Sequence, residues 1–336
     1  MSRAAPSPRT PTTEVLHDVV RLACRAPSMH NTQPWAWRID GAALELYADH
    51  SRGTPAADPA GRHVLIACGA ALHHAEVAAS ALGWAPTVHR FPRDEDPDLV
   101  ARIELGPAAR PDPAEADDAV DPALMLEALL ARRTDRRQFT SWQVPPERLQ
   151  HLAAAAAPRG AQAVPVVDEA SRHRVEQLLA EAAEQQAGDH ALQAEQGRWL
   201  DRSAADGVPR ETVPRLVPGS ASHRSRFGAG WLPQPGREPE SWDAVLVLAT
   251  EQDHRDSWLR SGESLSALWL EAVRNGLAVL PLSQVVEVPR TRRALQRELL
   301  GGTAVAQLVV RVGWPSTTLP PLPPTPRRSV EEVLRS

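Results

Sequence analysis

The chain has 336 residues, of which 42% are hydrophobic, and a formal net charge of −5 at neutral pH. This length exceeds one average domain and predicts two, with enough apolar residues for sizeable cores. The slightly acidic balance argues against a nucleic-acid partner, which usually requires a basic face. Cys24 and Cys68 belong to no CxxC pair, so we expect buried, reduced thiols.

The N-terminal sequence predicts a cytoplasmic protein. Residues 1–13 are polar and rich in proline, and they lack the apolar stretch of a signal peptide. The chain contains no run of about 18 uninterrupted apolar residues, which argues against a membrane span. We therefore expect a protein with no membrane partner.

The first half predicts a helix, a hairpin, a longer helix and two further strands, in that order. These are residues 13–25, 36–49, about 62–82, 87–91 and 99–105. Asp40-Gly41 is a favoured hairpin turn, and Gly83 is suited to end the long helix. Residues 107–120 have the composition of a linker, so we divide the chain into units 1–118 and 119–336.

The second half predicts two helices, then a strand, a helix, a strand, two helices and a final strand. These are residues 124–134, 144–157, 163–168, 171–186, 243–250, 263–275, 291–299 and 304–312. Residues 187–240 have little apolar period, which predicts a long excursion or lid rather than core. We expect Trp199, Phe227 and Trp231 to anchor this lid. The proline-rich tail, residues 313–336, should stay extended until a short final helix.

Two glycine-bounded segments of equal length occur in the chain. Gly69–Gly83 and Gly262–Gly276 each enclose an apolar, helix-like sequence, and several apolar positions coincide between them. Two generic alanine-rich helices would also give this pattern. The alternative is a duplicated α+β unit, a covalent version of a two-fold dimer.

The common catalytic and nucleotide-binding signatures are missing from the sequence. It contains no GxSxG, HExxH, P-loop or GxGxxG motif. His73 and His74 are adjacent on a predicted helix, so they face different directions and predict ordinary helix residues. We therefore expect no metal site.

Two groups of residues remain as candidate binders. The first is rich in arginine and comprises Arg132, Arg133, Thr134, Arg136 and Arg137, with Arg327 and Arg328 in the tail. Guanidinium groups bind phosphate through paired hydrogen bonds, and a threonine hydroxyl can complete the shell. Taken alone, such a charge run is also typical of a solvated face.

The second group lies in the sequence APSMHNTQPW, residues 26–35, between a predicted helix and a predicted strand. Ser28, Asn31 and Gln33 offer both donors and acceptors, which suits the edge of a planar heterocycle. The alternative is a turn whose polar side chains cap its own backbone.

Together these motifs resemble those of the nitroreductase-fold flavoproteins. Residues 26–35 are similar to the turn of that family in which Asn and Gln precede Pro-Trp, and residues 131–139 to its opening arginine motif. Residues 276–284, GLAVLPLSQ, resemble its segment beside the flavin ring. RVGWP, residues 311–315, followed by the PRR of residues 326–328, resembles its C-terminal phosphate-binding end.

The motifs are divided between the halves. The first half has the turn of residues 26–35, which we call the amide turn, but no arginine motif. The second half has both arginine motifs, but it reads APRGAQAVPVV where the amide turn is expected. This division resembles the Acg-type family of FMN-binding, nitroreductase-like proteins. The resemblance implies an α+β nitroreductase-like fold, duplicated within one chain as an intramolecular pseudo-dimer with a long lid insertion. It also implies a monomer with one FMN between the halves.

The resemblance further implies which residues would contact FMN. Those implied for the phosphate, the ribityl chain and the flavin N1/O2 edge are Arg132, Arg133, Thr134, Arg136, Arg327 and Arg328. Those implied for the isoalloxazine are Pro27, Ser28, Met29, Asn31 and Gln33, with the backbone of Pro281, Leu282 and Ser283 near the flavin N5. Ser283-Gln284 stands where typical nitroreductases have an acidic residue and glycine, so the sequence departs from the family at the N5 contact.

In function, the resemblance implies an FMN-dependent oxidoreductase that uses electrons of the NAD(P)H type and a small-molecule acceptor. Because the flavin carries the chemistry, no catalytic side chain is expected. The alternative is a protein that binds and sequesters FMN under a closed lid, with little or no NAD(P)H-dependent activity. A paralogue that binds no flavin is disfavoured by the full set of motifs.

Overall fold

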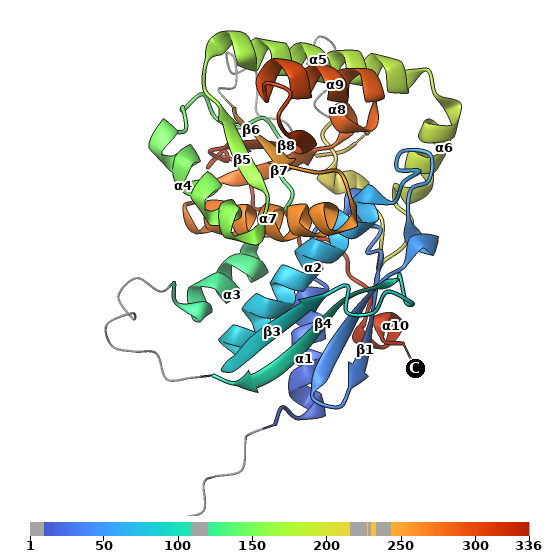
Figure 1. Ribbon diagram of the computed structural model, residues 1–336. Helices are drawn as coiled ribbons and strands as arrows, with labels where there is room; N and C mark the ends of the chain where they lie inside the picture. Colours follow the sequence, from blue (N-terminus) through green and yellow to red (C-terminus); the bar gives the residue numbers. More distant parts are fainter. Residues whose placement is uncertain (1–9, 109–119, 216–226, 228–229, 233–242, 336) are drawn as a thin grey trace, which may run out of the picture.

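Two four-stranded antiparallel sheets form the framework of the protein (Figure 1). The computed structural model describes residues 10–108, 120–215, 227, 230–232 and 243–335. The first sheet has the order β1-β2-β4-β3, with strands Trp35–Asp40, Ala43–Ala48, Leu99–Pro107 and Trp84–Arg90. The second has the order β5-β6-β8-β7, with strands Gln162–Val166, Ala244–Thr250, Val305–Gly313 and Ala278–Leu282. Because the two orders are equivalent, the predicted duplicated α+β fold is confirmed.

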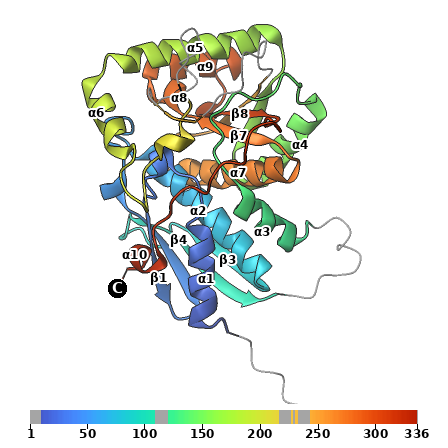
Figure 2. The same cartoon turned by 180° about the vertical axis from the view of Figure 1, so that it is seen from behind.

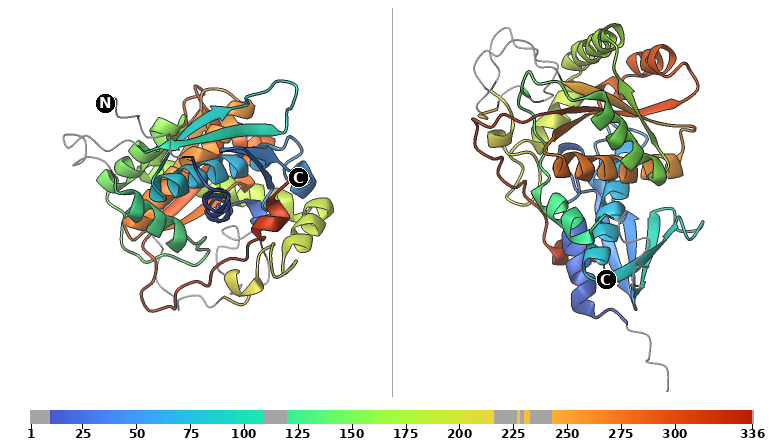
Figure 3. Two further views of the ribbon diagram at one scale, coloured as in Figure 1. Left: turned by 90° about the horizontal axis from the view of Figure 1, so that it is seen from below. Right: turned by 90° about the vertical axis from the view of Figure 1, so that its left-hand side faces the viewer.

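Two long helices cross between the sheets, α2 (Arg62–Ala81) and α7 (Arg255–Arg274). In the side view of Figure 3, α7 lies between the second sheet and the first half. The predicted glycine-bounded segments thus occupy equivalent places, at the centre of the molecule. Helix α7 begins before the predicted residue 263 because the His254 side chain accepts a hydrogen bond from Ser257 N and caps an earlier start.

Shorter helices support this central pair. Helix α1 (Thr13–Ala23) packs on α2, and α4 (Pro146–Ala156) packs on α7 in the corresponding position. Helix α3 (Pro122–Ala131) contacts both central helices. The predicted boundary near residue 118 lies outside the described residues.

The second half carries additional helices on the outer face of its sheet. Figures 1 and 2 show them above the sheet, on the side opposite α7: α5 (Glu169–Ala187), α8 (Gln284–Glu287) and α9 (Pro289–Leu299). Helix α6 (His190–Trp199) follows α5 and lies in the region predicted to be an aperiodic lid. The sequence pattern did not predict this helix. One of the buried positions of α6 is occupied by Glu195, whose carboxylate accepts hydrogen bonds from the backbone N–H groups of residues 56 and 57. Because a charged residue stands at a buried position, the sequence of α6 does not show the apolar period of a helix.

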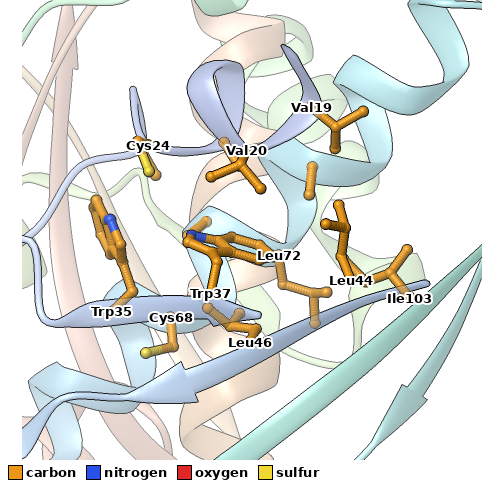
Figure 4. Packing of buried hydrophobic residues seen from close by; sticks show 14 of the residues in the cluster. Val19, Val20, Cys24, Trp35, Trp37, Leu44, Leu46, Cys68, Leu72 and Ile103 are labelled. Carbon is orange, nitrogen blue, oxygen red and sulfur yellow. The ribbon is translucent and has the colours of Figure 1, made fainter. Parts of the chain in front are cut away.

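The first half has its own core, between α1, α2 and the first sheet. Figure 4 shows Trp37 of β1 beside Leu72 of α2, and Trp35 near Cys24, in one cluster of buried residues. Helix α2 is long and apolar enough to span a membrane, but 83% of its most apolar window is buried within the protein. Cys24 and Cys68 are free, buried thiols, as predicted, and burial raises the pKa of Cys24 to about 12.

The C-terminal tail returns from the second half to the first (Figure 2). After β8 it runs to the short helix α10 (Val330–Val333), which packs against α1 and β1. Arg335 N donates to Trp37 O at 2.7 Å and secures the end of the chain. This path carries Arg327 and Arg328 to the amide turn of the first half.

Candidate functional site

A cavity of about 860 Å³, including its mouth, lies where the two halves meet. The first half contributes the amide turn and the start of α2, and the second contributes α7, the end of β7 and the start of α8. The predicted residues that line this large cavity are Pro27, Ser28, Met29, Thr134, Arg136, Pro281, Leu282 and Ser283. Most of the remaining lining is apolar, including Leu265 and Trp269, which sequence reasoning did not identify.

Two smaller cavities continue from the large one. The nearer, of about 320 Å³, shares Ser28, Thr134 and Arg136 with it and adds Asn31, Arg132 and Arg327, among others. The farther, of about 220 Å³, is lined by Arg25, Arg132, Arg133, Thr325 and Arg327. We call this last set the arginine pocket. Arg25 is a member that sequence reasoning missed, because it precedes the amide turn as an isolated charge.

Two guanidinium groups of the arginine pocket have N–H groups that lack an acceptor among the described residues. Arg132 is 4% exposed, and its Nε and Nη1 have no hydrogen-bond acceptor among the described residues. Its Nη2 donates to Arg25 O at 3.0 Å, and its guanidinium lies 4.6 Å from the ring centre of Trp269. Arg327 Nε also lacks an acceptor in the described part of the chain. None of the described residues that line these two smaller cavities is acidic.

The electrostatics of the arginine pocket favour an anion. Burial, reinforced by the charges of Arg327, Arg133 and Arg25, lowers the pKa of Arg132 well below its usual range. Burial and Arg25 lower the pKa of Arg327 to about 10. Buried charge is costly unless a counter-charge and hydrogen bonds compensate it, so this pocket is suited to a multiply charged anion such as a phosphate monoester.

The segment after α3 reaches the cavity by pairing with the edge of the second sheet. Thr134 forms a parallel bridge with Val279 of β7, and Asp135 N donates to Val279 O. Arg137, although part of the same arginine run, is held by Asp135 at 2.7 Å and lines none of these cavities. Arg136 lines the large cavity and lies 5.8 Å from the ring centre of Phe227.

The amide turn has an unusual backbone. His30, Asn31 and Gln33 have φ values of 50°, 56° and 51°, in the left-handed region that non-glycine residues rarely adopt. Ser28 Oγ accepts a hydrogen bond from Gln33 N at 2.9 Å and helps to close the turn. Such strain persists only where the surroundings hold it, and it is concentrated at functional sites.

The amide side chains of the turn bind other parts of the chain. Asn31 Nδ2 donates to Gly207 O at 3.0 Å and to Pro326 O at 3.1 Å. Gln33 Nε2 donates to Ala205 O at 2.8 Å, and its Oε1 accepts from Arg328 N at 2.9 Å. Asn31 lines the nearer small cavity, whereas neither Gln33 nor Arg328 lines any of the three cavities.

The lid contacts the cavity at one described residue. Phe227 is 7% exposed, lines the large cavity and meets the His30 ring edge to face, with centres 5.1 Å apart. Trp199 is also buried, but Trp231 is 65% exposed, so the predicted anchoring role of Trp231 was wrong. Large parts of the predicted lid, 216–226, 228–229 and 233–242, lie outside the described residues.

The histidines differ in their relation to this site. His73 and His74 are buried against α7 and both contact the Ser266 hydroxyl. His63, which sequence reasoning did not single out, lines the large cavity, and its Nε2 lies 3.7 Å from Glu287 Oε1. Within the described part of the chain, no three His, Cys, Asp or Glu side chains gather as metal ligands would.

Comparisons with known proteins give matches over nearly the whole chain. No family model matches. The Mycobacterium tuberculosis protein named "Putative NAD(P)H nitroreductase Rv3131" is 36% identical over 334 residues, covering 98% of this chain and 94% of that protein. "Putative NAD(P)H nitroreductase acg" from the same organism is 34% identical over 333 residues, covering 96% of each. Among solved structures, a Bacteroides fragilis nitroreductase with bound FMN covers 60% of this chain and 93% of its own, with 14% identity and a TM-score of 0.39.

Proposed function

Because the chain belongs to the Acg family of nitroreductase-like proteins, we propose that it is an oxidoreductase that binds one FMN between its two halves. The observation that carries this proposal is that two N–H groups of buried Arg132 lack an acceptor among the described residues and lie beside a largely apolar cavity. The chain provides a place for an anion and a place for a flat apolar group, one next to the other.

The arginine pocket fits the phosphate of FMN. Arg132 and Arg327 line both small cavities and would form charge-assisted hydrogen bonds with the phosphate oxygens. Arg133 and Arg25 also line the arginine pocket, and Thr325 adds a hydroxyl. The phosphate charge would offset the repulsion among these guanidinium groups.

The large cavity fits the flavin ring system. Pro27, Ser28 and Met29 form the wall from the first half, and the backbone from Pro281 to Ser283 forms part of the opposite wall. Thr134 and Arg136 line both this cavity and the nearer small one, so they would contact the ribityl chain and the adjoining ring edge. Asn31 would contact the ligand where it passes the turn, whereas Gln33 and Arg328 would hold the turn and the tail in position.

FMN, when bound, would supply the electron transfer that no side chain of this protein can perform. The protein would orient the ring, exclude water from it and supply charge near it. No separate dinucleotide-binding motif occurs in the sequence, so NAD(P)H and a small-molecule acceptor would occupy the mouth of the large cavity in turn.

One FMN per chain is proposed because ion pairs are formed at positions in the first half that correspond to residues of the site. The offset that relates Gly69 to Gly262 places Arg90 at the position of Ser283, and Arg90 forms two hydrogen bonds with Glu263, at 2.8 and 2.6 Å. The same offset places Glu76 at the position of Trp269, and Glu76 pairs with Arg159. We propose a cytoplasmic monomer whose halves, 1–118 and 119–336, replace the subunits of a dimer.

A second candidate function is FMN sequestration. Phe227 occupies part of the wall of the large cavity, and Ala205 and Gly207 of the lid accept hydrogen bonds from the amide turn. If the lid stays closed, the protein would retain FMN without access for NAD(P)H.

The flavin content of the purified protein, followed by anaerobic mixing with NADPH, tests both functions. A stoichiometry near one FMN per chain and bleaching of the flavin absorbance would support the oxidoreductase. Bound flavin that NADPH and NADH leave oxidised, although dithionite reduces it, would favour sequestration. Failure to bind FMN after reconstitution would refute both.

A further inference from the structure

The first part of the lid, residues 199–213, has a conformation of its own, and we call it the lid base. Val208 N donates to Trp199 O at 2.7 Å, and Asp201 N donates to Val208 O at 3.0 Å, so the loop between them is closed by backbone hydrogen bonds. Gly207 has a φ of 82°, and a Cβ atom there would overlap Trp199 O. The backbone of the lid base is therefore closely packed on itself.

The lid base covers one of the two small cavities. Val208 and Thr212 are buried and line the nearer small cavity. Val208 also packs with Val213 and Phe227 in a small apolar cluster. None of the described residues of the lid base lines the arginine pocket. An anion in the arginine pocket can therefore affect the lid base only through the residues that lie between them.

Asn31 of the amide turn is such a residue. Its Nδ2 donates to Gly207 O of the lid base at 3.0 Å and to Pro326 O at 3.1 Å. Its Oδ1 accepts a hydrogen bond from Arg327 Nη1 at 3.0 Å. These partners fix the orientation of the amide, because its nitrogen faces carbonyl oxygens and its oxygen faces a guanidinium. A continuous path of hydrogen bonds thus runs from the arginine pocket to the lid base.

The guanidinium of Arg327 forms the other end of this path. Its Nη2 donates to Arg25 O at 2.9 Å and to Ala26 O at 3.1 Å, whereas its Nε lacks an acceptor among the described residues. The charges of Arg25 and Arg133 repel it. Because a guanidinium is planar and rigid, an anion that accepts from Nε would also hold Nη1 against Asn31. Without an anion, the repulsion favours displacement of the Arg327 side chain from Asn31.

We propose that a phosphate group in the arginine pocket fastens the lid base to the amide turn, and that Asn31 transmits this effect as a positioning residue. The inference rests on the phosphate site of the proposed function and describes the regulation of that site. A flavin with a phosphate would hold the lid base in place, and a flavin without one would leave it loose. Because such coupling is reciprocal, a fastened lid base would strengthen phosphate binding by the same factor.

Amide hydrogen exchange of the full chain, freed of FMN, tests the effect of phosphate. The amides of Gly207 and Val208 report on the lid base. Their exchange should be at least about 5-fold slower with saturating FMN than with saturating riboflavin. Helix α9, whose residues line none of the three cavities, is the internal reference and should exchange equally with both ligands. Equal exchange of the lid base with FMN and riboflavin would overturn the proposal.

Inorganic phosphate distinguishes the source of the phosphate group. It is compared with sodium chloride at the same ionic strength and pH. Slower exchange of the lid base with inorganic phosphate would show that any phosphate in the arginine pocket is sufficient. Slower exchange with FMN alone would assign the effect to the phosphate of the cofactor. If the protein bound neither FMN nor phosphate, the proposed function and this inference would both fail, whereas bound FMN with unchanged lid-base exchange would refute only the inference.

Two variants test the role of Asn31. Asn31→Gly removes the amide, and glycine adopts the left-handed φ of this position without strain. The difference in exchange between FMN and riboflavin should then disappear. Asp206→Asn is the matched control, because it weakens a different attachment of the lid base, the ion pair with Arg52 at 2.5 Å. It should speed exchange with both flavins and keep their ratio. A wild-type ratio in Asn31→Gly, or loss of the ratio in both variants, would refute the role of Asn31.

Discussion

Gly69 of α2 and Gly262 of α7 each face the backbone of the other helix where the two helices cross. A Cβ atom on Gly69 would overlap Leu259 O, and one on Gly262 would overlap Ile66 O. The relationship is reciprocal, because Ile66 and Leu259 occupy the same place relative to their glycines. The repeat seen in the sequence is therefore a two-fold contact between helix backbones.

Gly69→Ala should destabilise the protein by about 1–3 kcal/mol, because the added methyl group forces α2 and α7 apart in a well-packed core. Urea unfolding measures the free energy. Gly197→Ala in α6 is the matched control, since a Cβ there meets nothing within 4 Å; alanine should be neutral or slightly stabilising at that helical position. Equal stability of the Gly69→Ala variant and the wild type would contradict the close crossing.

Arg132→Ala should weaken FMN binding by about 2–5 kcal/mol, because a buried phosphate would lose a charge-assisted partner. Equilibrium titration with FMN measures this loss. The effect on the stability of the FMN-free protein should be favourable. Arg132→Met removes an uncompensated buried charge and should therefore raise the melting temperature in the absence of FMN. Arg290→Ala, at a side chain that is 81% exposed, is the control for both measurements. Unchanged FMN affinity in Arg132→Ala would place the phosphate elsewhere.

Phe227→Ala should speed the reduction of bound FMN by NADPH, because it opens the wall of the large cavity while leaving the arginine pocket intact. Stopped-flow absorbance under anaerobic conditions measures the rate. Trp231→Ala alters an exposed residue of the same segment and should have no effect. Equal rates in all three proteins would show that Phe227 does not limit access.

The ion pair between Asp253 and Arg292 should contribute stability that acid removes. Burial alone would raise the pKa of Asp253, but hydrogen bonds from Arg292 and Trp258 lower this pKa to about 2. The pKa of an aspartate in an unfolded chain is ~3.9. The contribution is thus complete above about pH 4 and is lost as the pH falls towards 2. Between pH 4 and 2 the free energy of unfolding should fall further in the wild type than in Asp253→Asn. Parallel curves would contradict the shift.

Cys24 and Cys68 should resist a thiol reagent such as DTNB at pH 8 in the native protein. Burial keeps both thiols protonated, raising the pKa of Cys24 to about 12, and only the thiolate reacts. Both should react promptly in urea. Rapid labelling without unfolding would show that the core of the first half opens.

The elements with strong local signals could be predicted from the sequence alone. The Asp40-Gly41 turn, the glycine at the end of α2 and the apolar repeat along α7 depend on contacts within a few residues. Helix α6 could not be predicted in this way. Its buried Glu195 is satisfied by backbone groups more than a hundred residues away, so its pattern looks polar until the chain is folded.

The sequence by itself determined which residue types are available to the site, namely an amide-rich turn, an arginine run and a basic tail. Only the tertiary structure decided their roles. Arg132 and Arg137 belong to one run, yet Asp135 neutralises Arg137, whereas Arg132 is buried beside three further arginines. Gln33 belongs to the predicted ligand-binding turn, yet its amide is engaged by Ala205 and Arg328. The reason is physical. A buried polar group forms hydrogen bonds with the groups that the fold places about 3 Å away, and the spacing of residues along the sequence does not give these distances.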